Sequence, residues 1–309
     1  MTAETTLFDR ALVRRRRRRA AAHFATSDFL MRRAAEDFAW RLNAITRDFP
    51  LALDLGARTG VLADALTAHA PERIGVLFQS DYVHAMIGQA KGPRLVADEE
   101  ALPFGMQTLD AIFSVLNLHL VNDLPGCLIQ IRRALKPDGL FLGALFGGDT
   151  LMELRAALEQ AELECQGGVS PRVAPFADVK TLGTLLQRAG MALPVVDNDR
   201  VTVTYAHPIK LMEDLRAMGE TNALKARHKA PLRRATLGRA CEIYQETHGD
   251  NQGRVPATFE IITLTAWAPH PKQQQPLKPG SAKMRLADAL GTNELSTGDI
   301  TAPGETDGA

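Results

Sequence analysis

The segment LALDLGARTGVLADAL, residues 51–66, joins a short apolar run to a glycine-containing turn and then to a pattern typical of a helix. The apolar run reaches Asp54, and the turn passes through Gly56 and Gly60. A buried strand that leads through glycines into a helix is typical of nucleotide-binding turns in α/β proteins. Arg58 stands where a third glycine is expected. The segment therefore predicts a strand, a ligand-binding turn and a helix, with Arg58 as a departure from the usual turn.

Further apolar runs follow this segment, and helical patterns separate most of them. Short continuous apolar runs are typical of parallel strands that are buried on both faces. Strands that alternate with helices predict a parallel, doubly wound sheet with right-handed crossovers. The runs are RIGVLF (73–78), RLVA (94–97), LDAIFSV (109–115) and GLFLGALF (139–146), and the clearest helix is expected over 123–136.

The pattern changes after the fifth strand. A helix is expected to start with Asp149 or Thr150 as its N-cap, and another helix and two strands follow it. We expect the charged helical segment between those two strands to be an insertion that lies over the sheet as a cap. The predicted fold class is α/β: a doubly wound, mostly parallel, seven-stranded Rossmann-like sheet with a helical cap insertion. The second helix is expected over 177–189, the strands over 200–205 and 258–267, and the cap over about 206–255.

Three regions are predicted along the chain. Residues 1–48 form a basic arm and a helix, because apolar residues recur at helical spacing up to Leu42. Residues 49–268 form the sheet domain with its cap. Residues 269–309 contain many Pro, Gln, Lys and Gly residues at first and a polar end, so they are expected to be largely disordered.

The composition limits the classes of partner and compartment. Lys plus Arg and Asp plus Glu both total 36, so the net charge is zero, which argues against a dedicated nucleic-acid-binding protein. Three widely spaced cysteines are typical of reduced thiols in a cytoplasmic protein. The longest apolar segment, 109–121, is interrupted by polar residues and is too short for a transmembrane helix, and the N-terminus lacks the apolar part of a secretory signal. A cytoplasmic protein is expected.

Six consecutive arginines, Arg14–Arg19, are the exception to this balance. Six consecutive residues cover every face of a helix, so the run is not an amphipathic membrane stripe. One interpretation is a solvated helix start or a flexible arm. The other is a docking patch for an acidic protein, RNA or anionic lipid head groups, which would allow peripheral contact with a membrane.

Candidate ligand-binding residues gather where the predicted strands end, because open α/β sheets bind ligands at the carboxyl ends of their strands. Glycines allow positive φ and a close approach of the backbone to a ligand. An acid that closes the second strand can accept both hydroxyls of a ribose, and an acid after the third can accept from an adenine amine. The candidates are Asp54, Gly56, Ala57, Arg58 and Gly60 after the first strand, Asp81 after the second, Asp98 and Glu99 after the third, and Ser114 and His119 at the end of the fourth.

The spacing of the turn discriminates among cofactors. The chain has neither the G-x-G-x-x-G of dinucleotide sites nor the G-x-x-x-x-G-K-[ST] of P-loops. An acid two residues before the first glycine, with the last glycine four residues further on, resembles the D-x-G-x-G-x-G loop of class I S-adenosylmethionine-dependent methyltransferases. Asp81 and DEEALPF (98–104) fall where that superfamily binds ribose and adenine. The resemblance implies S-adenosyl-L-methionine as the cofactor.

Three longer segments resemble one branch of this superfamily. The branch includes a mitochondrial complex I assembly factor with a methyltransferase fold, described as an arginine hydroxylase of a complex I subunit, and its bacterial relatives. The likeness covers about residues 7–290. More distantly, the chain resembles the malonyl-carrier-protein methyltransferase of biotin synthesis. The segments are FGGDTLMELRAALEQAELECQGGVSPRVAPF (146–176), LMEDLRAMGETNAL (211–224) and VPATFEIITLTAW (255–267).

The resemblance implies an enzyme that modifies or assists a protein substrate, such as a complex I subunit, during respiratory complex I assembly. It would be cytoplasmic in a bacterium and in the mitochondrial matrix in a eukaryote. Two alternatives remain open: a malonyl-carrier-protein O-methyltransferase, and a non-catalytic assembly chaperone that has kept the fold. Arg58, in place of the middle glycine of the loop, is the feature that supports the chaperone.

Two residues near the predicted site keep two interpretations each. Arg58 carries a strain of roughly 1–2 kcal/mol if its φ is positive and none if its φ is negative. His119 is either a general base on the acceptor side or a hydrogen-bonded packing residue.

The cap carries two further groups of polar residues. Glu213, Asp214 and Glu220 form either an acidic mouth suited to a cationic acceptor or a solvated helix face. His248 and Asp250 form the only His-x-Asp pair, and nothing places a second histidine beside them. No metal site is therefore expected.

Overall fold

The computed structural model describes residues 6–273, 284 and 286–293. The chain forms two units, Met1–His270 and Pro271–Ala309. In the second unit the described residues include one short helix, α10 (Leu286–Leu290). Most of the predicted disordered tail, 269–309, lies outside the described residues.

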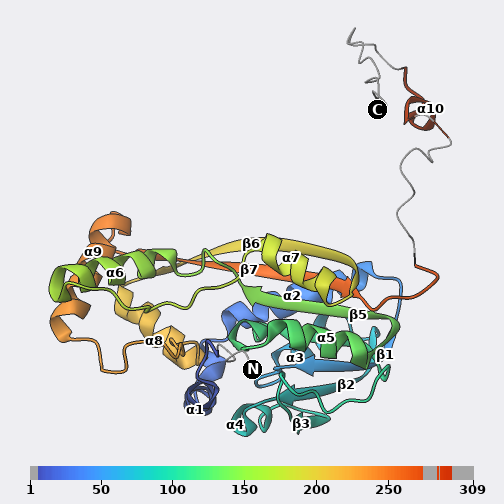
Figure 1. Ribbon diagram of the computed structural model, residues 1–309, viewed down its shortest axis with the longest axis horizontal. Helices are drawn as coiled ribbons and strands as arrows, with labels where there is room; N and C mark the ends of the chain where they lie inside the picture. Colours follow the sequence, from blue (N-terminus) through green and yellow to red (C-terminus); the bar gives the residue numbers. More distant parts are fainter. Residues whose placement is uncertain (1–5, 274–283, 285, 294–309) are drawn as a thin grey trace, which may run out of the picture. The chain divides into compact units, whose positions relative to one another are not determined.

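The strands of the described chain form one seven-stranded sheet in the order β3-β2-β1-β4-β5-β7-β6 (Figure 1). All neighbouring pairs from β3 to β5 are parallel, and β7 is antiparallel to both β5 and β6. This confirms the predicted fold class. The strand order reverses between β1 and β4, so their carboxyl ends meet at the switch point where such sheets bind ligands. The strands are β1 (Phe49–Leu55), β2 (Ile74–Asp81), β3 (Arg94–Val96), β4 (Leu109–Val115), β5 (Leu135–Phe146), β6 (Ala192–Tyr205) and β7 (Val255–Trp267).

Helices cover both faces of the sheet (Figure 1). Buried residues of α2, α3 and α6 pack in one hydrophobic cluster with the sheet, and those of α5 and α7 pack in a second cluster. Across the described residues, none of the helices has the length and apolar character needed to cross a membrane. The helices are α1 (Arg10–Ala20), α2 (Phe29–Ala44), α3 (Val61–His69), α4 (His84–Ile87), α5 (Leu124–Ala134), α6 (Met152–Gln166), α7 (Val179–Arg188), α8 (Pro208–Met218) and α9 (Arg234–His248), with short 3₁₀ helices η1 (Phe24–Thr26) and η2 (Leu118–Leu120).

Local capping signals explain where two of these helices begin. The Asp9 carboxylate accepts a hydrogen bond from the backbone N–H of Leu12 at the start of α1, with an O···N distance of 3.0 Å. The Asp123 carboxylate does the same for Gly126 at the start of α5, at 2.8 Å. Each bond satisfies a backbone donor that has no partner inside its helix.

The start of α6 differs from the prediction. Its N-cap is Leu151, which adopts a left-handed conformation with φ 57°. Asp149 and Thr150, the predicted N-caps, make other contacts: Asp149 pairs with Arg200, and the Thr150 hydroxyl bonds to the backbone of Glu260 on β7. Long-range bonds to the two antiparallel strands therefore replace the local cap.

The arginine run lies in α1, and its six members have different environments. Arg17 is fully buried, whereas the side chains of Arg14, Arg15, Arg18 and Arg19 are exposed. The interpretation as a flexible arm is therefore wrong, because the run is helical. The interpretation as a solvated helix holds for the four exposed arginines but not for Arg17. One face of α1 packs onto the sheet domain, and it carries an arginine into the interior.

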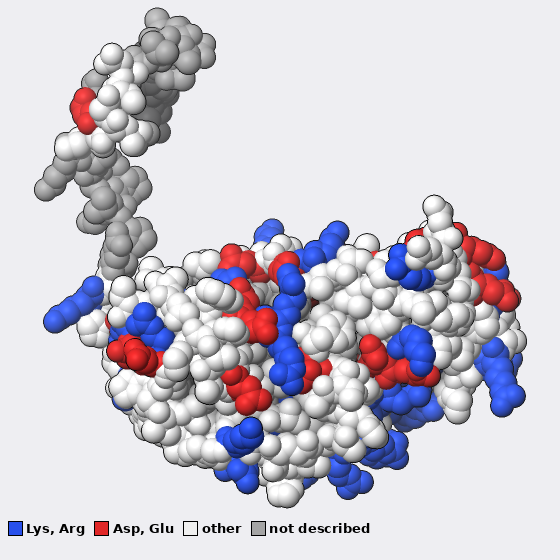
Figure 2. All heavy atoms as spheres, turned by 180° about the vertical axis from the view of Figure 1, so that it is seen from behind, with Lys and Arg blue, Asp and Glu red and all other residues white. Residues whose placement is uncertain are grey.

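Both signs of charge are spread over the surface. On the face drawn in Figure 2, several groups of basic side chains lie directly beside acidic ones. The surface ion pairs include Arg33 with Asp199, at 2.8 Å, and Arg41 with Asp197, at 2.7 Å. This mixing agrees with the zero net charge of the chain.

Candidate cofactor and acceptor site

The turn after β1 has the backbone conformation that its glycines predict. Gly56 and Gly60 have φ values of 83° and 92°, which residues other than glycine rarely adopt. A Cβ added at Gly56 would lie 2.2 Å from the Asn117 side chain, so that position admits no other residue without a shift of its neighbour. Arg58 also has a positive φ, 54°. The strained interpretation of Arg58 is therefore the one that applies.

Asp54 is a buried carboxyl without a partner. Neither of its oxygens accepts a hydrogen bond from any described residue, and the residue is 1% exposed. Burial, assisted by the nearby charge of Asp81, raises the pKa of Asp54 to about 8. A buried polar group without a partner marks a place where a ligand or water supplies the missing bonds.

Asp81 and Ser114 lie at the ends of the strands on either side of β1. The Asp81 carboxylate accepts from the backbone N–H of Arg58, at 3.1 Å, and of Val83, at 2.7 Å. Burial raises the pKa of Asp81 despite the opposing charge of Arg58. The Ser114 hydroxyl donates to the Leu55 carbonyl at 2.8 Å, which ties β4 to the start of the turn. Ala57 is buried in the same turn, and its backbone N–H bonds to the Ser80 carbonyl at 2.8 Å.

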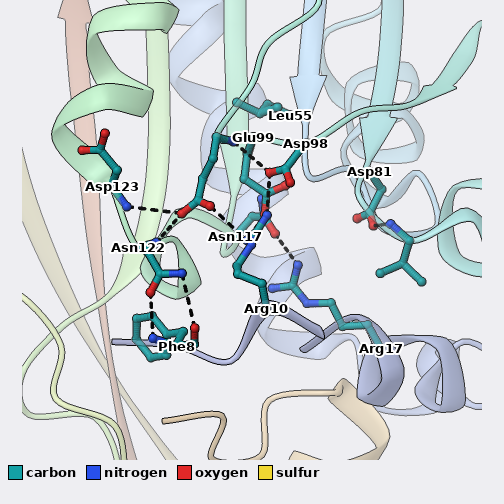
Figure 3. Close-up of polar contacts among 12 residues, drawn as sticks. Phe8, Arg10, Arg17, Leu55, Asp81, Asp98, Glu99, Asn117, Asn122 and Asp123 are labelled. Carbon is teal, nitrogen blue, oxygen red and sulfur yellow. Dashed lines mark hydrogen bonds and ion pairs between the residues drawn. The ribbon is translucent and has the colours of Figure 1, made fainter. Parts of the chain in front are cut away.

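The two acids after β3 contact the arm. Arg10 of α1 donates to Asp98 at 2.6 Å and to Glu99 at 2.9 Å (Figure 3). Burial alone would raise the pKa of Glu99, but the hydrogen bond and charge of Arg10 outweigh it and lower the pKa. Arg10 also lies over the Tyr82 ring, 4.5 Å from its centroid. The arm therefore covers the end of the sheet where the candidate acids gather.

Arg17 enters the same region from α1, which the sequence did not predict. Its guanidinium donates to the Asn117 side chain at 2.7 Å (Figure 3). Burial, together with the charge of Arg58, lowers the pKa of Arg17 to about 10. The arginine run gave no signal that its fourth member would be the buried one. Arg10, Arg17 and Asn117 are thus parts of the site that only the structure reveals.

Glu220, directly after α8 and Gly219, is the anion on which these charges converge. Its carboxylate lies 2.6 Å from Arg58, 3.6 Å from Arg17 and 3.1 Å from His119. Burial would raise the pKa of Glu220, but the hydrogen bond from His119 and the charge of Arg58 lower it to about 2. Glu220 is therefore ionised and neutralised inside the protein. The predicted acidic mouth is therefore wrong, because the Glu220 carboxylate is paired inside the protein. Glu213 pairs with Lys210 on the surface.

His119 lies in η2, just beyond β4, and its ring packs with two aromatic side chains that also contact each other. The ring centroids of Phe146 and Phe176 are 4.8 and 5.7 Å away. Burial lowers the pKa of His119 although its bond to Glu220 acts in the opposite direction. The lowered pKa favours the neutral imidazole. Its Nδ1 has no hydrogen-bond partner among the described residues.

An apolar cavity of about 200 Å³ lies beside His119 and Glu220. Phe146 and Phe176 form part of its wall together with Leu215 of the cap, and Glu220 contributes a carboxylate. Leu215 is buried on the inner side of α8. The wall is therefore mostly apolar, with one anion, Glu220, and two cations, Arg172 and Arg216. Glu220 links it to the cofactor turn through its bond to Arg58.

The remaining polar candidate, the His-x-Asp pair, makes other contacts. The Asp250 carboxylate pairs with Arg254 at 2.8 Å, and the His248 ring packs edge-on against Tyr244. Among the described residues no group of three or more His, Cys, Asp or Glu side chains lies close enough to hold a metal ion.

The comparisons with known proteins agree with this geometry. A family model described as "Methyltransferase domain" matches residues 53–143, from Leu53 in β1 to Gly143 in β5, and so includes the turn. The match agrees with the predicted S-adenosyl-L-methionine cofactor. Among solved structures, the YcgJ protein of Bacillus subtilis has a TM-score of 0.52 at 14% identity and covers 75% of this chain and 97% of its own. At that identity the likeness shows the fold.

Curated relatives cover nearly the whole chain. "Arginine-hydroxylase NDUFAF5, mitochondrial" of Danio rerio is 41% identical over 94% of this chain and 92% of its own length, and the Homo sapiens protein is 42% identical over 94% and 85%. "Malonyl-[acyl-carrier protein] O-methyltransferase" of Methylovorus is 32% identical over 89% and 95%. The chain therefore belongs to the family of methyltransferase-fold proteins that includes arginine-hydroxylase NDUFAF5 and, more distantly, malonyl-[acyl-carrier protein] O-methyltransferase.

Proposed function

We propose that this protein binds S-adenosyl-L-methionine at the carboxyl ends of β1 to β4 and acts on an arginine side chain of a protein in respiratory complex I assembly. The orphaned Asp54 carboxyl and the glycine turn support the cofactor, because they offer buried bonding capacity and close backbone approach. The residues that would hold it are Asp54, Gly56, Ala57, Arg58, Gly60, Asp81, Asp98, Glu99 and Ser114.

When bound, S-adenosyl-L-methionine supplies a methyl group activated on a sulfonium. The protein then has to position the acceptor and exclude water, which are large contributions to transfer reactions. The burial of Asp54, Asp81 and Glu99, each 1% exposed, supports exclusion of water. The arm, with Arg10 and Arg17, forms the cover.

The single observation that carries the arginine acceptor is the identity to the arginine-hydroxylase relatives, which is 41% and 42% against 32% for the malonyl-carrier methyltransferase. The cavity wall contains one anion, Glu220, and two cations, Arg172 and Arg216. The Glu220 carboxylate stays ionised, since its pKa is lowered to about 2, but it already holds the guanidinium of Arg58 and is therefore not a free counter-ion for the acceptor.

His119 is the candidate general base of this site. Its neutral imidazole, with a free Nδ1 among the described residues, can take a proton from the acceptor. Glu220, 3.1 Å from Nε2, would hold the ring in place and stabilise the imidazolium that forms.

Mass spectrometry of complex I subunits from wild-type and deletion cells tests this proposal. We expect one arginine-containing peptide to lose either a methyl group or an oxygen atom in the deletion strain, and the mass difference identifies the reaction. A deletion strain that requires biotin would instead support the malonyl-carrier methyltransferase. If no subunit carries such a modification in wild-type cells, and if an Asp81→Ala variant fully restores complex I assembly in the deletion strain, the non-catalytic chaperone would be supported.

A further inference from the structure

A second, larger cavity opens where α1 meets the cap, and its wall is strongly basic. This groove has a volume of about 760 Å³ and lies between α1, α8 and the segment that follows α8. Glu213 is the one acidic residue among the described residues that line it. The basic side chains that line it are Arg16, Arg19, Arg172, Arg216, Arg227 and Lys229.

Most of these cations have no anionic partner among the described residues. The Arg16 guanidinium donates to the backbone carbonyls of Thr221, at 2.8 Å, and of Asn222, which are neutral. Arg19, Arg216 and Lys229 are exposed and form no ion pair within the described chain.

The other three charged members of the wall are paired. Arg172 pairs with Glu162 and Arg227 with Asp9, while Glu213 is held by Lys210. Burial and the neighbouring positive charges of Arg227 and Arg15 lower the pKa of Arg16, as expected where cations crowd together. The groove therefore has an excess of four positive charges, although the net charge of the whole chain is zero.

The chemistry of the wall distinguishes among anionic partners. The described lining includes no Phe, Tyr or Trp, the large aromatic side chains on which the bases of a single-stranded nucleic acid commonly stack. It also includes none of the exposed large apolar side chains that would insert into a bilayer. Small apolar groups such as Ala20, Ala217 and Pro231 lie between the cations. A concave basic wall with small apolar patches fits a peptide that carries carboxylates.

The groove adjoins the apolar cavity beside His119 and Glu220. Arg172, Arg216 and Leu232 contribute to the walls of both. A peptide held in the groove would therefore present a neighbouring side chain to that cavity.

We propose that the groove binds an acidic, extended segment of the protein substrate that flanks the modified residue. The identity of this segment as substrate rests on the proposed function, whereas its binding can be measured separately. The groove would then supply affinity and register, and the cavity would receive the side chain that reacts.

The test uses the full chain and a fluorescein-labelled peptide of alternating Glu and Ala, followed by anisotropy at low and high salt. The groove variant carries Arg19→Glu, Arg216→Glu and Lys229→Glu. The matched control carries Arg18→Glu, Arg188→Glu and Lys180→Glu, three exposed cations outside the groove. Both variants change the net charge equally, and their thermal melts report whether each is folded.

We expect the wild type to bind the peptide with an affinity that falls as salt rises, and the groove variant to bind about tenfold more weakly or worse. The control should stay within about twofold of the wild type. No binding by the wild type, equal losses in both variants, or tighter binding of an oligouridine or of phosphatidylglycerol vesicles would overturn the proposal. Calorimetry with S-adenosyl-L-methionine separates the two hypotheses, because its binding should persist in the groove variant even where peptide binding is lost.

Discussion

Glu220 is the anion of a buried ion-pair network. Two buried arginines and a histidine converge on its carboxylate. Arg58 has a positive φ, and its guanidinium donates a charge-assisted hydrogen bond of 2.6 Å to this carboxylate, which offsets the backbone strain. The departure from the glycine loop is therefore part of an ion-pair network.

Removal of this charge should destabilise the fold. In a Glu220→Gln variant the buried guanidinium groups of Arg17 and Arg58 lose their anion, and we expect the free energy of unfolding to fall by about 3–5 kcal/mol. Chemical denaturation measures this free energy of unfolding. Glu213→Gln is the control, since that carboxylate pairs with Lys210 in solvent and should change stability little. Equal effects of the two substitutions would contradict the network.

Asp54 predicts a pH dependence of stability. The pKa of Asp54 is about 8 in the folded chain against an ordinary aspartate value of 3.8, so the folded state binds the proton more tightly than the unfolded state. The stability contributed by this proton is therefore present at about pH 4 and is lost as the pH rises towards 8, by about 1.4 kcal/mol per unit at most. Denaturant unfolding at several pH values should show a smaller decline in Asp54→Asn than in the wild type. The exposed Asp64→Asn control should follow the wild type.

Among the helices, α1 differs most from its prediction, because the sequence predicts only a basic arm there. Arg10 and Arg17 make it a cover over the ends of the strands, whereas Arg16 and Arg19 line the basic groove. One short helix thus contributes to two neighbouring surfaces, because its faces are all basic and the fold buries only one of them.

Loss of the Arg10 contacts should loosen this helix. In Arg10→Ala the bonds to Asp98 and Glu99 disappear, and we expect the α1 amides to exchange their hydrogens about tenfold faster. Hydrogen-exchange mass spectrometry measures this, with Arg18→Ala as the exposed control. An unchanged exchange rate in α1, or an equal increase in β4, would show that these bonds do not hold the cover.

The start of α6 shows how tertiary contacts override a local signal. Asp149 and Thr150 are good N-cap residues, yet both are bonded to residues of the antiparallel strands. Capping is worth about 1 kcal/mol, and a buried hydrogen bond that would otherwise be lost costs as much or more. The helix therefore starts one or two residues later than its sequence predicts.

At the scale of the whole molecule, the cofactor should stabilise the fold. A ligand that binds only the folded state adds about 2.7 kcal/mol at a concentration 100 times its Kd. We expect S-adenosyl-L-methionine at that level to raise the Tm by about 5–10 °C. Differential scanning fluorimetry measures this, and Asp81→Ala should abolish most of the shift while Asp64→Ala keeps it. An unshifted wild-type melt would contradict the proposed cofactor site.

The sequence by itself determined the sheet, most of its helices and the turn that follows β1. These features depend on local rules, namely the length of apolar runs, helical spacing and the need for glycine at positive φ. The tertiary structure decided which charges are buried together. Arg17, Arg58, His119 and Glu220 come from four distant segments. A buried charge must find its counter-ion wherever the folded chain places one, so no local pattern could select Arg17 from six consecutive arginines.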